Sequence, residues 1–150
     1  MVCLGNICRS PLAEGLLKKK IDANALDWTV DSCGTADYHV GSPPDKRMIK
    51  IAAAFHTDIS NLRSRQFSLS DFEKYDLIYA MDKSNYRNII ELAKNNYQRN
   101  KVHLLLNEWK FGQNLEVPDP YYGSEQDFIN VYNLLDEALD SLLNNRNVKK

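Results

Sequence analysis

The sequence predicts an α/β fold in which helices cover both faces of a four-stranded parallel sheet, giving three layers. Short apolar segments alternate along the chain with longer segments whose apolar residues recur every three to four positions, which is the pattern of strands alternating with helices. The strand segments are mostly apolar runs, and this indicates burial on both faces, as in parallel sheets. With 150 residues, 43% of them hydrophobic, we expect one domain over residues 1–150.

The first half of the chain supplies a helix, a strand and a second helix after its opening loop. Apolar positions at helical spacing predict a helix over residues 10–24. Residues 28–33 read as a short buried strand, which Gly34 closes. Asp45 is placed to cap a helix that runs to about residue 56.

The second half of the chain continues the alternation of helices and strands. A short helix near residues 71–75 precedes an apolar strand over residues 77–81. A helix over residues 83–95 and a fourth strand over residues 102–106 follow. The last helix covers residues 124–145, where apolar residues repeat at a period near 3.6.

The predicted first strand is short, because just Met1 and Val2 precede Cys3. A strand in a globular protein usually has about five residues. We therefore expect either a sequence that is cut short or mis-assigned at its start, or an unusually short first strand, and we favour the former.

The loop after this strand, residues 3–11 (Cys-Leu-Gly-Asn-Ile-Cys-Arg-Ser-Pro), has the residue types of an anion-binding cradle. Gly5 and Asn6 tolerate a left-handed backbone, which turns successive N–H groups inward. Ser10 is a good helix N-cap and Pro11 suits the first helical position. A helix that starts there would direct its positive end at the bound anion.

Two side chains of this loop supply the chemistry. The planar guanidinium of Arg9 matches two phosphate oxygens. Cys3 then lies beneath the anion, in a field that favours the thiolate over the thiol. Taken singly, a buried cysteine, a glycine turn and a helix cap are common structural features. Their occurrence together at this spacing favours a phosphate site with a sulfur nucleophile.

A second segment, residues 117–123 (Val-Pro-Asp-Pro-Tyr-Tyr-Gly), has the properties of an acid-bearing loop. A cysteine-based phosphatase needs a proton donor for its leaving group. Asp119 lies between two prolines, which stiffen the loop and fix its direction. We expect Asp119 to reach over the phosphate from this separate loop.

The loop at residues 3–11 resembles the active-site loop of the low-molecular-weight protein tyrosine phosphatases, which reads Cys-x-Gly-Asn-x-Cys-Arg-Ser-Pro. The Asp-Pro-Tyr at Asp119 resembles the second signature of that family. Further segments recur in the same order, so the resemblance covers nearly the whole chain and implies the family's fold, a flavodoxin-like or Rossmann-like three-layer arrangement. These segments are Asp31-Ser32, Gly41-x-Pro-Pro-Asp45-x-Arg47, Arg65-Gln66, Asp71-Phe72, Tyr75-Asp76, Met81-Asp82 and Asn85.

This resemblance implies a protein tyrosine phosphatase that acts on phosphotyrosine-containing proteins and small aryl phosphates. Cys3 would form a phosphocysteine, Arg9 would bind the phosphate, and Asp119 would be general acid and then general base. No metal or organic cofactor is expected. The other implied site residues are Leu4, Gly5, Asn6, Ile7, Cys8 and Ser10 of the phosphate loop, Ser32 as a support for Asn6, and Tyr38, Tyr121 and Tyr122 as cleft walls.

Three further expectations also come from the resemblance. Cys8 would form a reversible disulfide with the nucleophile, making the site redox-sensitive. Leu62 stands where the family often has a histidine that supports the loop asparagine, so we expect a less rigidly held loop. Tyr121 and Tyr122 are candidate targets of a partner tyrosine kinase.

Composition excludes several other classes of protein. Nineteen basic and 20 acidic residues give a net charge of −1, which offers no case for nucleic acid or an anionic membrane. No apolar run is long enough to span a bilayer, and the first residues do not read as a signal peptide, so we expect a cytoplasmic protein without membrane insertion. Three cysteines without a secretory signal argue against a disulfide framework, and no zinc-site spacing is present.

Three alternatives remain for the function. An arsenate reductase on the same scaffold relays oxidation through later cysteines, whereas this sequence has none after Cys33. Phosphoarginine phosphatases of the family carry threonine where Ile7 stands, and isoleucine favours aryl phosphate. A non-catalytic phosphotyrosine-binding module would not need the nucleophile, the arginine and the acid together.

Overall fold

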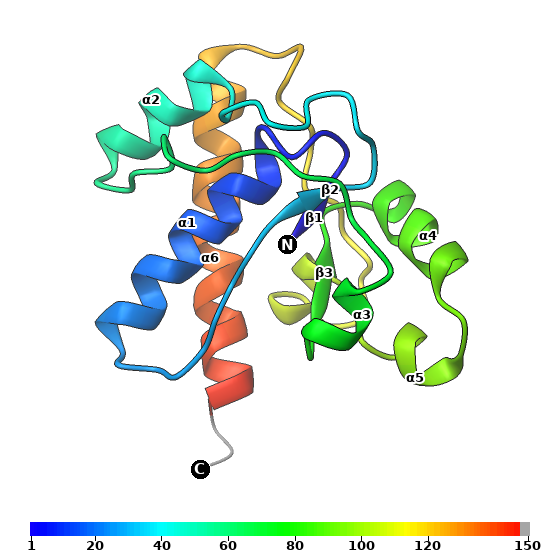
Figure 1. Cartoon of the computed structure of the whole chain (residues 1–150). Helices are drawn as coiled ribbons and strands as arrows, with labels where there is room; N and C mark the ends of the chain where they lie inside the picture. The colour runs from blue at the N-terminus through cyan, green and yellow to red at the C-terminus, as the bar shows by residue number, and fades with distance from the viewer. Residues whose placement is uncertain (148–150) are drawn as a thin grey trace.

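The computed structural model describes residues 1–147 and contains a four-stranded parallel sheet of order β2-β1-β3-β4 (Figure 1). The strands are β1 (Val2–Cys3), β2 (Cys33–Gly34), β3 (Ile78–Ala80) and β4 (Val102–Leu104). Val2 pairs with Cys33 on one side and with Ala80 on the other, so β1 is central. The predicted fold class, a parallel sheet between helical layers, is confirmed.

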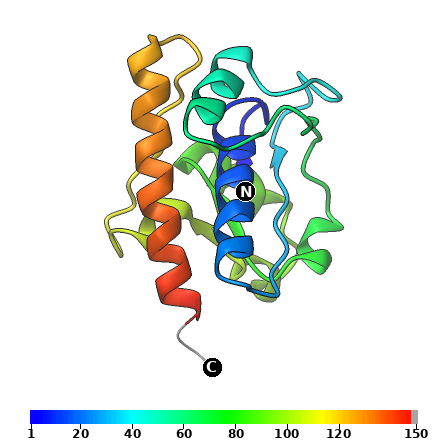
Figure 2. The same ribbon diagram turned by 90° about the vertical axis from the view of Figure 1, so that its left-hand side faces the viewer.

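Helices lie on both faces of this sheet, as two perpendicular views show (Figures 1 and 2). One side carries α1 (Arg9–Ala23), α2 (Lys46–Ala54) and α6 (Glu125–Asn147), with α6 packed along α1 and against α2. The other side carries α3 (Asp71–Lys74), α4 (Lys83–Leu92) and α5 (Asn96–Arg99), while the short 3-10 helix η1 (Leu105–Glu108) follows β4. No helix within residues 1–147 is both apolar enough and long enough to cross a bilayer.

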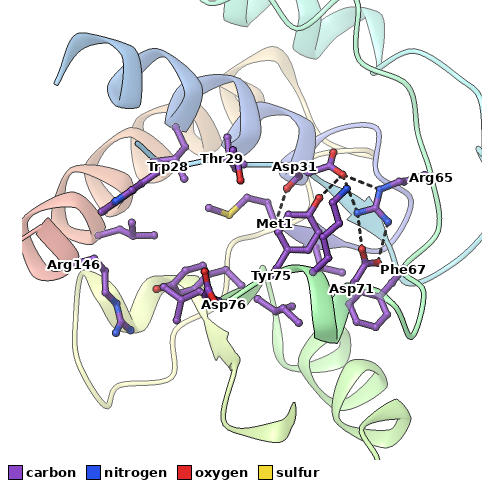
Figure 3. A pocket seen from close by; sticks show the side chains of 18 of the residues that line it. Met1, Trp28, Thr29, Asp31, Arg65, Phe67, Asp71, Tyr75, Asp76 and Arg146 are labelled. Carbon is purple, nitrogen blue, oxygen red and sulfur yellow. Dashed lines mark hydrogen bonds and ion pairs between the residues drawn. The ribbon is translucent and has the colours of Figure 1, made fainter. Parts of the chain in front are cut away.

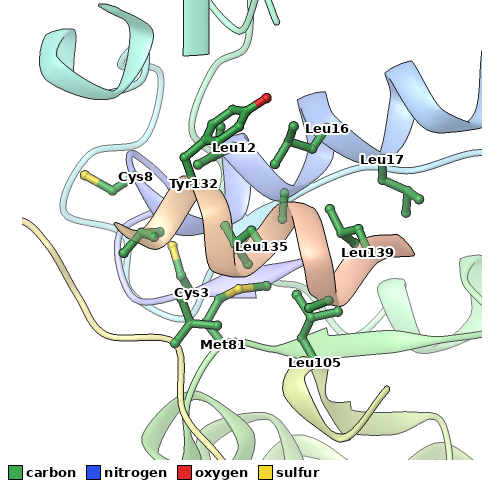
Figure 4. Close-up of a cluster of buried hydrophobic side chains, with 14 of the residues drawn as sticks. Cys3, Cys8, Leu12, Leu16, Leu17, Met81, Leu105, Tyr132, Leu135 and Leu139 are labelled. Atoms are coloured by element: carbon green, nitrogen blue, oxygen red, sulfur yellow. The ribbon is translucent and has the colours of Figure 1, made fainter. Parts of the chain in front are cut away.

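Alternate side chains of the strands divide between two apolar clusters. Cys3 and Tyr79 join the cluster beneath α1 and α6, where Leu12, Leu16, Leu135 and Leu139 pack (Figure 4). Their strand neighbours face the second cluster, beneath α3 and α4. Both faces of β1 and β3 are therefore buried, which explains why these strand segments are largely apolar. Cys3 ends β1 at the edge of the first cluster, next to the loop that follows.

The second strand differs from its predicted position, residues 28–33, because it covers just Cys33–Gly34. The Cys33 N–H donates to the carbonyl of Met1 at 3.0 Å, and the Met1 amino group donates to the Asp31 carbonyl at 3.0 Å. Pairing with β1 thus reaches back no further than Met1. Residues 28–30 pair with no strand of the described sheet.

Several other boundaries differ by one to three residues. The predicted strand over residues 102–106 ends at Leu104, where η1 begins. Two further differences have local reasons. The predicted helix over residues 83–95 ends at Leu92, and a separate helix, α5, starts after Asn95. The Asn95 side chain accepts from the Gln98 N–H and caps this new helix, a role that asparagine fills well. Helix α1 begins at Arg9, so Ser10 lies inside its first turn instead of capping it.

Candidate active site

The loop from Cys3 to Arg9 is fixed to the scaffold through its carbonyl groups. Thr35 and Ala36 N–H donate to the carbonyls of Cys3 and Leu4, at 2.9 and 3.0 Å. The hydroxyl of Ser64 donates to the Gly5 carbonyl at 3.0 Å. The remaining two bonds run from Asp45 N–H to the Ile7 carbonyl, 2.7 Å, and from Leu12 N–H to the Cys8 carbonyl, 3.3 Å. Five carbonyls of one short loop are thereby held outward.

This anchoring directs the N–H groups of the loop inward, because the C=O and N–H of a trans peptide point in opposite directions. Asn6 shows the result directly: its N–H points at Cys3 Sγ, 3.3 Å away. Asn6 takes the expected left-handed conformation, with φ of 57°. Gly5 does not have a positive φ; a Cβ there would lie 3.0 Å from the His39 ring, which would have to move slightly. The loop is a nest of inward N–H groups, suited to an anion.

Gly34 makes this loop possible from a neighbouring strand. A Cβ on Gly34 would lie 2.6 Å from the Leu4 carbonyl oxygen and 3.2 Å from the Asn6 nitrogen. Both atoms belong to the cradle, so any larger residue would displace it. The sequence shows Gly34 as the end of a strand, and its closeness to the loop is a tertiary feature.

The sulfur of Cys3 lies at the base of the loop, where the residue is 3% exposed. Ser10 Oγ is 3.0 Å from Cys3 Sγ. This position explains why Ser10 does not cap α1: its hydroxyl turns toward Cys3, Asn6 and the Cys33 carbonyl. A hydroxyl and a backbone N–H therefore both lie within hydrogen-bond reach of the sulfur.

Asn6 and Ser32 lie behind the loop and hold its shape. The Asn6 amide nitrogen donates to Ser10 Oγ at 2.8 Å and to Ser32 Oγ at 2.9 Å, and its oxygen accepts the Arg65 N–H at 3.1 Å. Asn6 therefore has its side-chain bonds filled without a histidine. Leu62, at the position where the family often has one, packs against the apolar cluster beneath α1.

Arg9 is buried under the cleft floor and held by fixed partners. Its Nη1 donates to Asp82 Oδ2 at 2.7 Å and to the Val117 carbonyl at 3.0 Å. Burial acts to lower the pKa of Arg9, but the charges of Cys3, Asp82 and Asp119 outweigh it and raise that pKa above its ordinary value. The guanidinium is therefore a permanent positive charge of fixed orientation. The sequence marks Asp82 only as part of the recurring Met81-Asp82 segment and assigns it no role in the site.

A cleft of about 220 Å³ opens above Cys3 and brings the two signature loops together. Asp119 Oδ2 lies 3.5 Å from Arg9 Nη2, while Asp119 Oδ1 accepts the Tyr121 N–H at 3.1 Å. The Asp119 side chain is 45% exposed, so it faces solvent at the mouth. The lining consists of Cys3, Leu4, Gly5, Ile7, Cys8, Arg9, Tyr38, His39, Asp119, Tyr121 and Tyr122. His39 is an addition to the predicted site, whereas Asn6, Ser10 and Ser32 lie outside this lining.

The aromatic rim of the cleft is braced from α2. The rings of Tyr121 and Tyr122 meet edge to face at 4.9 Å. The Arg47 guanidinium lies 5.5 Å from the centre of the Tyr121 ring and 4.5 Å from that of Phe128, within range of a cation–π contact. Asp45 holds Arg47 through two bonds, at 3.0 and 2.8 Å. The acid loop is thus connected to the element that anchors Ile7.

A larger cavity, of about 420 Å³, lies away from this cleft, at the amino ends of β1 and β3 (Figure 3). Its polar wall is an ion network in which Arg65 binds Asp31 and Asp71, at 3.0 and 2.9 Å. The Tyr75 hydroxyl also donates to Asp31, at 3.0 Å. Arg65 is neutralised by two carboxylates, and ligands of parallel sheets bind at the carboxyl ends of strands. The smaller cleft is therefore the candidate active site.

Comparisons with known proteins agree with this geometry. The family model described as low molecular weight phosphotyrosine protein phosphatase matches residues 1–150. A low molecular weight phosphotyrosine protein phosphatase of Schizosaccharomyces pombe is 41% identical over 134 residues, or 87% of this chain and 85% of that protein. A crystal structure of a protein tyrosine phosphatase from Entamoeba histolytica is 38% identical and has a TM-score of 0.88, covering 95% of this chain and 91% of its own.

One solved structure of different stated activity is equally close in shape. A Drosophila arginine phosphatase has a TM-score of 0.91 at 29% identity, covering 99% of this chain and 97% of its own. Similarity of the backbone therefore does not by itself distinguish a tyrosine phosphatase from an arginine phosphatase. By its full-length match and its relatives, the chain belongs to the low molecular weight protein tyrosine phosphatase family.

Proposed function

We propose that this protein hydrolyses phosphotyrosine in proteins through a phosphocysteine intermediate on Cys3. One observation supports this most strongly: the loop around Cys3 has its carbonyls tied outward, so its N–H groups form a cradle directly over the sulfur. A fixed guanidinium and a carboxyl group from a distant loop line the same cleft. A nucleophile, an anion site and a proton donor are thus present together.

In the first step, the Cys3 thiolate attacks phosphorus as the bond from phosphorus to the phenolic oxygen breaks. Asp119 gives its proton to that oxygen, so the leaving group departs as a neutral phenol. Arg9 and the loop N–H groups stabilise the charge on the equatorial oxygens.

In the second step, the Asp119 carboxylate takes a proton from a water molecule whose oxygen attacks phosphorus. The sulfur–phosphorus bond breaks, inorganic phosphate leaves, and the thiolate is restored. The positive field comes from Arg9, the loop N–H groups and the N-terminus of α1.

The walls of the cleft favour an aryl ester over other phosphate groups. Cys3 is nearly inaccessible at the base, while Tyr38 and Tyr122 stand exposed at the rim, 74% and 96% exposed respectively. A planar ring long enough to place its phosphate on Cys3 would pack between these walls. Ile7 adds an apolar side chain to the lining.

We expect a phosphotyrosine peptide to be a better substrate than a phosphoarginine peptide of the same sequence. The apolar lining at Ile7 suits a phenyl ring and offers nothing to a charged guanidinium, so kcat/KM should differ by at least about tenfold, or about 1.4 kcal/mol. Phosphate release from both peptides by the wild type and by Ile7→Thr measures this. Equal turnover of the two peptides by the wild type would refute the aryl preference.

A reversible oxidation of the site is also proposed, with peroxide as the oxidant. Peroxide would convert the Cys3 thiolate to a sulfenic acid, and Cys8 would then displace water to form a disulfide. Both residues line the cleft. Burial, followed by the charges of Asp45 and Cys3, raises the pKa of the Cys8 thiol, so its attack at neutral pH is slow.

We therefore expect the fraction of activity that dithiothreitol restores after peroxide treatment to rise with pH. A higher pH gives more Cys8 thiolate, which traps the sulfenic acid before further oxidation. Assays of recovered activity between neutral and alkaline pH, with Cys8→Ala beside the wild type, check this. Recovery that is independent of pH, or equal in Cys8→Ala, would contradict the role of Cys8.

A further inference from the structure

A buried carboxylate lies behind the phosphate loop and is not used in the reaction. Glu14 extends from α1 and is 4% exposed. Its Oε2 accepts the Ser32 hydroxyl at 2.7 Å, and its Oε1 lies 3.4 Å from Lys18 Nζ. The Met1 ammonium, which precedes β1, is a further charge that interacts with Glu14. Both groups in contact with the Glu14 carboxylate are donors, as an ionised carboxylate requires.

From Glu14 a chain of hydrogen bonds leads to the nucleophile. It runs through Ser32 Oγ, the Asn6 amide nitrogen and Ser10 Oγ to Cys3 Sγ, with successive distances of 2.7, 2.9, 2.8 and 3.0 Å. Each member is buried, so the bonds do not exchange freely with water. The chemistry of the groups in the chain decides which partner donates in each hydrogen bond.

The direction is set at Glu14. A serine hydroxyl has one proton, and an ionised carboxylate can only accept, so Ser32 donates to Glu14 and is left as an acceptor toward Asn6. The Arg65 N–H, at 3.1 Å from Asn6 Oδ1, needs an acceptor there as well. Both neighbours therefore oppose a flip of the Asn6 amide.

With the orientation of the Asn6 amide fixed, its second N–H donates to Ser10 Oγ. The hydroxyl proton of Ser10 is then free to be donated elsewhere. That proton reaches either the Cys33 carbonyl, 3.3 Å away, or Cys3 Sγ. When Cys3 is a thiolate, Ser10 can donate to it. A flipped Asn6 would instead present its oxygen to Ser10 and draw the proton away from the sulfur.

We propose that Glu14 is a positioning residue, which fixes the proton direction of this chain and so keeps Ser10 as a donor to the Cys3 thiolate. The proposal rests on the proposed function for its relevance to turnover, but it concerns a state of Cys3 that is measurable without substrate. Arg9 and Asp119 are the charged groups that face Cys3 from the cleft, and a substitution at Glu14 leaves both of them in place.

The test is the rate of Cys3 alkylation by iodoacetamide as a function of pH, followed by mass spectrometry of the Cys3 peptide. Glu14→Gln keeps the shape but can donate to Ser32, which frees Ser32 to donate to a flipped Asn6. Because the Cys3 thiolate loses one hydrogen-bond donor, we expect the alkylation rate at mildly acidic pH to fall about tenfold. This corresponds to a shift of about one pH unit in the midpoint of the rate–pH curve. The plateau of the rate at high pH should not change. The exposed Glu91→Gln on α4 carries the same chemical change and should behave as the wild type.

Ser32→Ala provides a second, independent break in the chain and should shift the midpoint in the same direction. The double variant should shift it no further than either single one, because both act through one path. A midpoint equal to that of the wild type in both single variants would overturn the proposal, and so would additive shifts. If wild-type protein hydrolysed no phosphotyrosine but these shifts appeared, the proposed function would fail while the role of Glu14 stood.

Discussion

Cys3→Ser is expected to abolish turnover of aryl phosphates while the phosphate site stays intact. A serine hydroxyl has no thiolate equivalent near neutral pH, so no covalent intermediate forms. Removal of the nucleophile costs on the order of 10⁶-fold in a serine protease, and we expect a loss of about 10⁴-fold or more here. Hydrolysis of para-nitrophenyl phosphate and of a phosphotyrosine peptide measures it.

The control for this variant is binding, because the cradle does not depend on the sulfur. Its shape comes from carbonyl bonds to Thr35, Ala36, Ser64, Asp45 and Leu12, none of which involves the Cys3 side chain. Calorimetry should show that Cys3→Ser still binds the phosphotyrosine peptide, and Cys33→Ser should keep its activity. A Cys3→Ser protein that still turns over substrate would remove the phosphocysteine from the reaction. Binding in a wild type that never hydrolyses would indicate a recognition module.

The sequence predicts the reactive part of this site because that part is local. Cys3, Arg9 and the turn between them belong to one loop, and the residue types in this register favour an anion cradle. Its supports come from elsewhere in the chain. Gly34 leaves space for the cradle, and Asp82 orients Arg9, yet each is far from the loop in sequence. Periodicity shows such residues as strand ends, since their contacts exist only after the sheet has assembled.

The boundaries of elements were less predictable than their order, and the reasons are physical. The run at residues 28–33 satisfies the local criteria for a strand, but a strand also needs a paired neighbour, and Cys33 is the one residue of this run that pairs with β1. Ser10 satisfies the criteria for an N-cap, but its hydroxyl is used by Cys3 and Asn6. In both cases a tertiary partner decided between two locally acceptable conformations.

Asp119→Asn is expected to lower kcat by about 10²- to 10⁴-fold on phosphotyrosine, the range of general acid catalysis. The tyrosine phenolate is a poor leaving group, with a conjugate acid of pKa about 10 in model peptides, so its departure depends on a proton. An aryl group that carries nitro substituents leaves readily as an anion and should lose far less. A series of aryl phosphates, with kcat plotted against leaving-group acidity, should show a steeper slope in the variant.

Asp82→Asn is the matched control, because Asp82 and Asp119 both contact Arg9 and only Asp119 lines the cleft. Loss of the 2.7 Å bond from Arg9 Nη1 to Asp82 leaves the guanidinium less firmly oriented, which weakens phosphate binding for every substrate alike. We therefore expect Asp82→Asn to lower kcat/KM without a change in the dependence on the leaving group. If Asp119→Asn behaved in that same uniform way, its carboxyl group would be a partner of Arg9 and the proton for the leaving group would have another source.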